Sequence, residues 1–174
     1  IKRRIFAQLE THCDAATVLT SNSSHLEPDQ IFAELKTPGR GAVTHYFYPA
    51  DRNPVVEVVA GARTDQATAD FLLRFYEGIG KFVVPVRSRY GFAVDPVFEG
   101  LFLAAALAVE KGMATVEQVD AVCQKTLGQG VGPFTAINLT GGNPLTQIGL
   151  QHYAQAIMPF FRVPELLTNQ IKLG

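Results

Sequence analysis

The sequence is poor in the residues that build disulfide frameworks and metal centres. It has 2 cysteines, Cys13 and Cys123, which lie far apart and form no C-x-x-C motif. The simplest interpretation is two reduced thiols in a reducing compartment, and we expect a cytoplasmic protein. The 4 histidines show no ligand spacing such as H-x-x-x-H, so we expect no metal site.

The sequence also lacks an excess of either charge and a long apolar run. Lys plus Arg number 15 and Asp plus Glu number 16, which gives no overall field to attract nucleic acid or an anionic membrane. The longest uninterrupted apolar run, Leu101 to Val109, is far below the roughly 20 residues that a membrane span needs. We therefore expect neither a nucleic-acid nor a membrane partner, and the 47% hydrophobic content excludes a disordered chain.

An initiator Met and a glycine-rich phosphate loop are missing as well. Residues 1–10 form a helix fragment with no signal-peptide core, as if the sequence began inside an element. No G-x-G-x-x-G follows a strand, because the glycines at 39–41 precede one and those at 128–132 lie between helices. We expect an N-terminal portion to be absent from this chain and one edge of its sheet to be exposed.

The chain changes character near residue 90. Before this point, short apolar runs typical of strands alternate with helical patterns at 28–36 and 65–77, the second capped by Thr64. This alternation predicts an α/β layer with a largely parallel sheet. The expected strands are 17–20, 42–47, 55–59 and 81–86, the last an edge strand or strand end because it contains Pro85.

From residue 92 onward the patterns are helical only. Expected helices cover 92–111, 115–127 with a capping box at Thr115, and 143–161, and Pro164 opens a last one. The apolar stripe from Phe98 to Val109 is typical of a core or dimer face. The sequence thus predicts an α/β domain over residues 1–90 followed by an all-α domain over residues 91–174.

Polar residues at predicted strand ends point to a site. Residues 21–25 (Ser-Asn-Ser-Ser-His) follow the first strand, and ligands of open parallel sheets bind beyond the carboxyl ends of strands. A plain loop with a helix cap is the alternative interpretation.

The second predicted strand carries His45 near its end, and Glu57 sits among valines in the third. If the chain reverses near Asp51, these two become cross-strand neighbours. A Glu bonded to one imidazole nitrogen would make the other nitrogen a general base. The alternatives are a structural ion pair, or Glu57 bound to Arg52 or Arg63.

These segments resemble the 3-hydroxyacyl-CoA dehydrogenases over essentially the whole chain and in the same order. Each segment alone is weak evidence, but the spacing of 12 residues from His45 to Glu57 is also family-like. The matching segments are Asn-Ser-Ser-His-Leu at 22–26, His-Tyr-Phe-Tyr-Pro at 45–49, Val-Glu-Val-Val at 56–59, Gly-Lys at 80–81, Gly-Phe-Ala-Val-Asp-Pro at 91–96 and Gly-Pro-Phe at 132–134.

The resemblance implies NAD-dependent oxidation of a 3-hydroxyacyl-CoA to the 3-oxoacyl-CoA in fatty-acid or related acyl-CoA metabolism. It implies that residues 1–90 are the C-terminal portion of a Rossmann-type NAD-binding domain. Residues 91–174 would be a helical domain, like the C-terminal domain of 6-phosphogluconate dehydrogenase, that binds substrate and forms a homodimer. Carried over by position, the catalytic candidates are His45 as base, Glu57 orienting it and Ser24 on the substrate oxygen; Asn22, Lys2 and Tyr48 would lie near the cofactor.

Three residues depart from the family pattern. Asp95 replaces an Asn that donates a hydrogen bond near the substrate carbonyl, whereas an ionised Asp only accepts; Asp95 is either a substrate contact or a helix N-cap before Pro96. Tyr48 replaces an Asn and brings bulk toward the nicotinamide. His25 stands where the family has Ser, and we interpret it as a loop residue rather than a second base.

Two other functions remain open at this point. The chain could be a non-catalytic or diverged assembly domain whose apolar helix serves dimerisation alone. It could also be one segment of a multifunctional fatty-acid oxidation protein.

Overall fold

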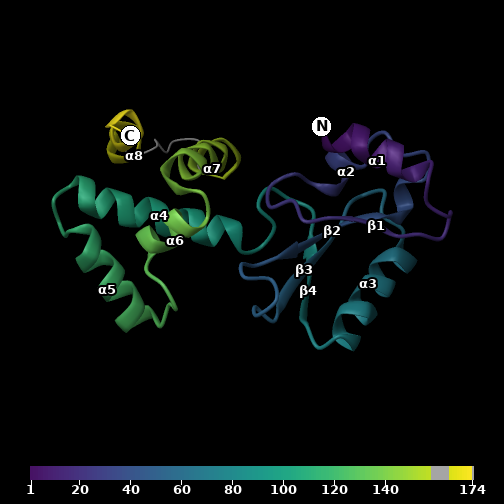
Figure 1. Cartoon of the computed structure of the whole chain (residues 1–174), viewed down its shortest axis with the longest axis horizontal. Helices are drawn as coiled ribbons and strands as arrows, with labels where there is room; N and C mark the ends of the chain where they lie inside the picture. The colour runs from purple at the N-terminus through teal and green to yellow at the C-terminus, as the bar shows by residue number, and fades with distance from the viewer. Residues whose placement is uncertain (158–164, 174) are drawn as a thin grey trace. The chain divides into compact units, whose positions relative to one another are not determined.

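The computed structural model describes residues 1–157 and 165–173. The chain divides into two compact units, Ile1–Asp95 and Pro96–Gly174. The α/β pattern of the sequence is found in the first unit and the helical pattern in the second (Figure 1). Among the described residues, no helix is both long and apolar enough to cross a bilayer.

A four-stranded sheet in the order β1-β2-β3-β4 organises the first unit. The outer pairs, β1 with β2 and β3 with β4, are parallel, whereas β2 and β3 are antiparallel, so the sheet is mixed. The strand that contains Pro85 lies at an edge, where a missing backbone donor is tolerated. The strands are β1 (Leu19–Ser21), β2 (Gly41–Tyr46), β3 (Val55–Ala60) and β4 (Phe82–Arg87).

Helices cover both faces of this sheet (Figure 1). On one face, α1 (Lys2–Glu10) and α2 (Pro28–Ile31) pack on a core that includes Phe32, Val43 and Val59. On the other face, α3 (Gln66–Gly78) packs Leu72 and Tyr76 against alternate residues of β2 and β3. The alternation of side chains along β2 and β3 therefore divides their buried residues between two cores, one on each face of the sheet.

The helix expected at 28–36 ends earlier, at Ile31, and the last residues of the expected helix make contacts with α1 instead. The Glu10 carboxylate accepts hydrogen bonds from the backbone amides of Lys36 (2.8 Å) and Thr37 (3.0 Å), so those amides are not available to extend the helix. A short 3₁₀ helix, η1 (Pro38–Arg40), follows instead.

Other predicted helix starts are shifted by one to three residues, the largest shift being that of the helix expected from residue 92, which begins at Asp95. Asp65 rather than Thr64 is the N-cap of α3, because the Thr64 hydroxyl accepts from Gly61 N–H and donates to the Gly41 carbonyl. The helix expected from residue 143 begins at Gly142, and its expected end near residue 161 lies outside the described residues, as does Pro164.

The second unit consists of helices. The capping box at Thr115 is present, with its hydroxyl accepting from the Gln118 backbone amide (3.3 Å). Asp120 accepts from the amides of Phe134 and Thr135, and so caps the next helix. The helices are α4 (Asp95–Glu110), α5 (Val116–Leu127), α6 (Pro133–Leu139), α7 (Gly142–Ala156) and α8 (Glu165–Leu173).

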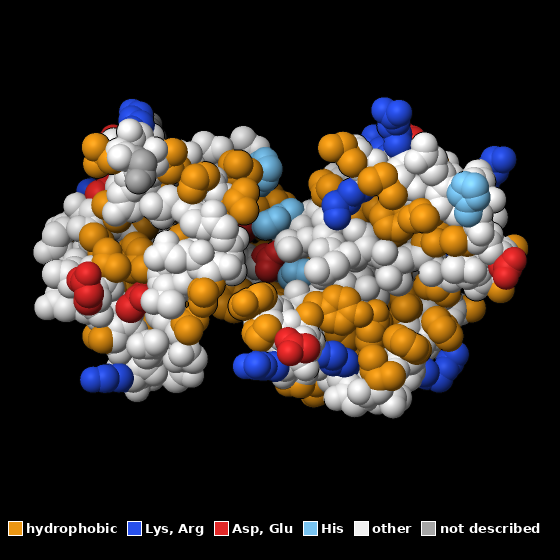
Figure 2. All heavy atoms as spheres, viewed as in Figure 1, with side chains coloured by type: hydrophobic (Ala, Val, Ile, Leu, Met, Phe, Trp, Pro, Cys, Tyr) orange, Lys and Arg blue, Asp and Glu red, His pale blue; other side chains and the backbone are white. Residues whose placement is uncertain are grey.

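An open groove of about 620 Å³ runs between β1 and α3. It is lined mainly by residues 16–18 before β1 and by the α3 residues Phe71, Leu72 and Phe75. Figure 2 shows hydrophobic side chains gathered on the face of this unit where Figure 1 draws β4 and α3. The groove contains none of the candidate site residues of the sequence analysis.

Candidate active site

His45 and Glu57 are directly opposed in the antiparallel pair of strands β2 and β3. Both lie on the sheet face that carries Val43 and Val59, since each is two residues from one of those valines along its strand. Their side chains are only 5% and 2% exposed. The predicted cross-strand contact is thus confirmed, and it is buried.

The Glu57 carboxylate is held by three hydrogen bonds. One oxygen, Oε2, lies 2.8 Å from Nδ1 of His45. The other, Oε1, accepts from the backbone amides of Ala93 (3.0 Å) and Val94 (3.2 Å). These donors compensate for the loss of water around a buried carboxylate. Since an ionised carboxylate only accepts, a neutral imidazole at this position would carry its proton on Nδ1 and leave Nε2 as the acceptor.

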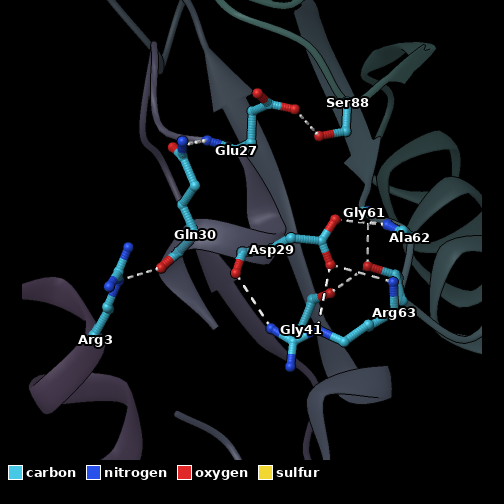
Figure 3. A network of polar contacts seen from close by, with 10 residues as sticks. Arg3, Glu27, Asp29, Gln30, Gly41, Gly61, Ala62, Arg63 and Ser88 are labelled. Carbon is cyan, nitrogen blue, oxygen red and sulfur yellow. Dashed lines mark hydrogen bonds and ion pairs between the residues drawn. The ribbon is translucent and has the colours of Figure 1, made fainter. Parts of the chain in front are cut away.

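The alternative partners proposed for Glu57 are elsewhere. Arg52 contacts Asp51 at 3.8 Å on the surface, and Arg63 contacts Asp29 at 3.4 Å. Figure 3 shows that Asp29 also holds the turn after β3, because its carboxylate accepts from the backbone amides of Ala62 and Arg63. The interpretation of Glu57 as an arginine partner is therefore wrong.

Ser24 completes the contacts of the imidazole. Its Oγ lies 3.2 Å from Nε2 of His45, at the end of the loop that leaves β1. In the same loop, the Ser23 hydroxyl accepts from the Leu26 backbone amide (3.1 Å), which makes a local turn. The structure thus brings Ser24, His45 and Glu57 into one line of hydrogen bonds.

Aromatic rings enclose the imidazole, and one of them was not foreseen. The rings of Phe47 and Phe92 pack edge-on against His45, with centroids 4.9 and 5.5 Å away. Phe92 is fully buried and has φ +55°, the left-handed region that non-glycine residues seldom adopt. This conformation immediately precedes the two amides that bind Glu57. Only the neighbouring Gly91, also at positive φ, marks this turn in the sequence.

The three expected cofactor-side residues lie in different places. Asn22 joins the ends of two strands, because its side-chain oxygen accepts from the Tyr46 backbone amide (2.9 Å) and its amide nitrogen therefore remains the donor end. Tyr48 is 75% exposed after β2. Lys2 is exposed on α1. Within the described part of the chain, neither Tyr48 nor Lys2 joins the hydrogen bonds around His45.

Asp95 and His25, two departures from the family pattern, contact each other. Nε2 of His25 lies 3.7 Å from Oδ2 of Asp95, which begins α4. The His25 ring stacks on Tyr90 with centroids 5.1 Å apart. His25 and Asp95 are 70 residues apart in the sequence, and no pattern around either residue predicts that they are in contact.

The residues at the strand ends fit one end of a dinucleotide. Asn22 offers an amide donor and Ser24 a hydroxyl beside a buried imidazole, which suits a nicotinamide ribose next to a substrate hydroxyl. The pyrophosphate would need a glycine-rich turn between a strand and a helix N-terminus, which residues 1–157 do not provide. No group of three or more His, Cys, Asp or Glu in the described chain is placed to hold a metal ion.

Comparisons with known proteins agree with this geometry. Residues 1–89 match the family model of the 3-hydroxyacyl-CoA dehydrogenase NAD binding domain, and residues 91–174 match that of the C-terminal domain. A 3-hydroxybutyryl-CoA dehydrogenase of Mycobacterium tuberculosis is 33% identical over 176 residues, covering all of this chain and 62% of that protein. The chain therefore spans about three fifths of that relative's length.

Two further relatives extend the comparison. An L-carnitine dehydrogenase of Streptomyces griseus is 35% identical over 175 residues, covering 95% of this chain and 52% of that protein. The crystal structure of FadB2 from M. tuberculosis superposes with a TM-score of 0.90 at 32% identity, covering 99% of this chain and 61% of the other. From the family models, the sequence identity and the shared fold, the chain belongs to the 3-hydroxyacyl-CoA dehydrogenase family.

Proposed function

We propose that this chain carries the acid–base half of an NAD-dependent 3-hydroxyacyl-CoA dehydrogenase. The observation that carries the proposal is the buried line of hydrogen bonds from Glu57 through His45 to Ser24. An alcohol is a poor hydride donor until its proton is removed, so the reaction needs a base at that oxygen. A neutral imidazole with an accepting nitrogen beside a hydroxyl meets this need.

In the proposed mechanism, Nε2 of His45 takes the proton of the substrate's 3-hydroxyl group. Glu57 fixes the imidazole with its proton on Nδ1 and stabilises the imidazolium that forms. When bound, NAD would supply the acceptor for the hydride that leaves C3. The C3–O bond becomes a carbonyl, and the proton remains on His45 until it is released.

Ser24 and Asn22 position the reacting groups. The Ser24 hydroxyl, 3.2 Å from Nε2 in the structure, donates to the substrate oxygen once that oxygen occupies the space beside the imidazole. The Asn22 amide nitrogen would hold the nicotinamide ribose, and Lys2 and Tyr48 would lie near the cofactor. Asp95 is a candidate contact of the acyl group, because the family residue at this position donates near the substrate carbonyl.

The wider setting follows from the same assignment. We place the reaction in fatty-acid or related acyl-CoA metabolism, with 3-hydroxybutyryl-CoA as first substrate to test, because this acyl-CoA names the M. tuberculosis relative. The helical residues 91–174 form the substrate-binding and homodimer domain. Cys13 and Cys123 are both free thiols, which suits a reducing compartment such as the cytoplasm.

L-Carnitine is a second candidate substrate, and one residue favours it. Asp95 places a carboxylate where the family pattern has an amide, and a carboxylate attracts the quaternary ammonium group of carnitine. The related L-carnitine dehydrogenase makes this substrate worth measuring beside the acyl-CoA.

The test is NADH formation by the natural full-length protein with 3-hydroxybutyryl-CoA and, separately, with L-carnitine. Turnover of the acyl-CoA that disappears in His45→Gln supports the proposal. Turnover of L-carnitine but not of the acyl-CoA would make L-carnitine the substrate of the proposed dehydrogenase. A folded dimer without reduction of NAD by either substrate refutes the enzyme and leaves the assembly domain as the function. A hydratase unit on the same polypeptide would identify a multifunctional fatty-acid oxidation protein.

A further inference from the structure

Two segments that are far apart in the sequence contact each other beside His45. The first is the Ser24 loop, residues 22–27 after β1, and the second is the 88–95 segment after β4. Ser88 Oγ donates to Glu27 Oε2 at 2.5 Å, as Figure 3 shows. His25, in the same loop, stacks on Tyr90 and lies 3.7 Å from Asp95.

The 88–95 segment also holds the other end of the hydrogen-bonded line. Ala93 and Val94 donate their amides to Glu57, and Asp95 is the next residue along the chain. In the loop, His25 is likewise the residue after Ser24. The contact between His25 and Asp95 therefore closes a ring that runs through Glu57, His45 and Ser24. A shift of either segment changes the distance between Ser24 Oγ and His45 Nε2.

This contact is a property of this chain rather than of the family pattern. Ser and Asn stand at the two positions in that pattern, and they would form no ion pair. Here the Asp95 side chain is 16% exposed and that of His25 is 37% exposed, so the carboxylate is shielded more than its partner. The imidazole of His25 is the polar ring that lies 3.7 Å from this carboxylate, and it attracts the carboxylate when it is protonated.

We infer that His25 and Asp95 are positioning residues that keep the Ser24 hydroxyl on His45, an inference that rests on the proposed function. Neither residue touches a reacting atom in this assignment. His25 ties the loop to the 88–95 segment through Asp95, and through that segment to the amides that hold Glu57. The serine and the carboxylate are thereby fixed relative to the same imidazole.

The experiment is a double-mutant cycle in the natural full-length protein, with 3-hydroxybutyryl-CoA and NAD. His25→Ala and Asp95→Asn each lower kcat about 10-fold and leave KM for the acyl-CoA within about twofold. The double variant falls no further than the worse single variant, because both changes break one contact. His25→Gln, whose side-chain amide keeps a polar N–H group that can reach Asp95, retains most of the wild-type kcat.

A control and a spectroscopic measurement separate this role from general loss of stability. Arg63→Gln removes a contact of similar length, 3.4 Å to Asp29, in the same unit, and leaves kcat unchanged. The imidazole ¹⁵N resonances of His45 move in His25→Ala, because the hydrogen bond from Ser24 changes. They stay in place in Arg63→Gln.

Three results would overturn the inference. Additive losses in the double variant would mean that the two residues act independently. A change in KM alone would make Asp95 a substrate contact. Unchanged kcat and unchanged His45 resonances in His25→Ala would leave the contact without a role. If the wild-type protein turns over no substrate, the proposed function fails and this inference fails with it, whereas an active wild type with unaffected variants refutes the inference alone.

Discussion

Replacing Glu57 by Gln tests the orientation of His45 with little change in shape. The glutamine oxygen can still accept from Ala93 and Val94, but its NH₂ group then faces Nδ1 of His45. Nδ1 must now accept, so the imidazole proton moves to Nε2, the atom that takes the substrate proton. We expect kcat to fall about 10²–10⁴-fold, which corresponds to about 3–5 kcal/mol of activation free energy.

The effect on folding is too small to account for such a loss. Exchanging a charge-assisted hydrogen bond for a neutral one in a buried site costs about 1–3 kcal/mol. A domain with about 5–15 kcal/mol of stability then remains almost entirely folded at 25 °C, and a merely structural Glu57 would leave kcat nearly unchanged. The two roles therefore differ by at least about 10²-fold in the expected kcat.

The assay compares steady-state NADH formation and thermal unfolding of Glu57→Gln with a matched variant, Asp29→Asn. Asp29 also accepts two backbone amides, from Ala62 (2.7 Å) and Arg63 (3.3 Å), but it does not contact His45. Asp29→Asn should lower the melting temperature and keep kcat. The expected loss of kcat is about 10²-fold or more, so a Glu57→Gln enzyme whose kcat lies within about threefold of the wild type would refute the reasoning. An equal loss of kcat in Asp29→Asn would also refute it.

Three further predictions concern other parts of the chain. His45→Gln should lower kcat about 10²–10⁴-fold at unchanged folding by circular dichroism, and a retained kcat would remove His45 as the base. Gly132→Ala should cost about 1–2 kcal/mol in urea unfolding, since its Cβ would lie 2.3 Å from Cγ of Asp120, the cap of α6; an unchanged midpoint would contradict this. The backbone amide of Lys36 is the main cause that lowers the pKa of Glu10 to about 2, so the stability from this carboxylate is complete above pH 4.5 and is lost as the pH falls toward 2. Glu10→Gln should therefore weaken the dependence of the melting temperature on pH between 5 and 2. A pH dependence parallel to that of the wild type would contradict this role of Glu10.

The sequence was sufficient to predict features that depend on periodicity and turns. Short apolar runs located all four strands to within two residues, and the turn-like segment at 51–54 predicted that His45 and Glu57 would face each other. The capping box at Thr115 was likewise evident, since its residue types are specific to helix starts.

Features that depend on irregular backbone could not be predicted. The amides that hold Glu57 follow Phe92, whose left-handed conformation costs energy and is maintained by burial of its ring. No side-chain pattern encodes a backbone donor. The contact of His25 with Asp95 joins two loops, whose path is set by tertiary packing rather than by local propensity. The end of the segment predicted as a helix has the same origin, because Glu10 from α1 binds the amides of Lys36 and Thr37.

The opposed arrangement of His45 and Glu57 has a consequence for how proteins of this kind can diverge. The backbone hydrogen bonds between β2 and β3 align the two side chains, and the intervening residues 47–54 do not. Insertions or deletions in that connection leave the two side chains facing each other, whereas the loss of a single residue inside either strand turns one of them to the opposite layer. New ligand contacts are therefore free to evolve at the tip of this hairpin, while its arms admit substitution only at constant length.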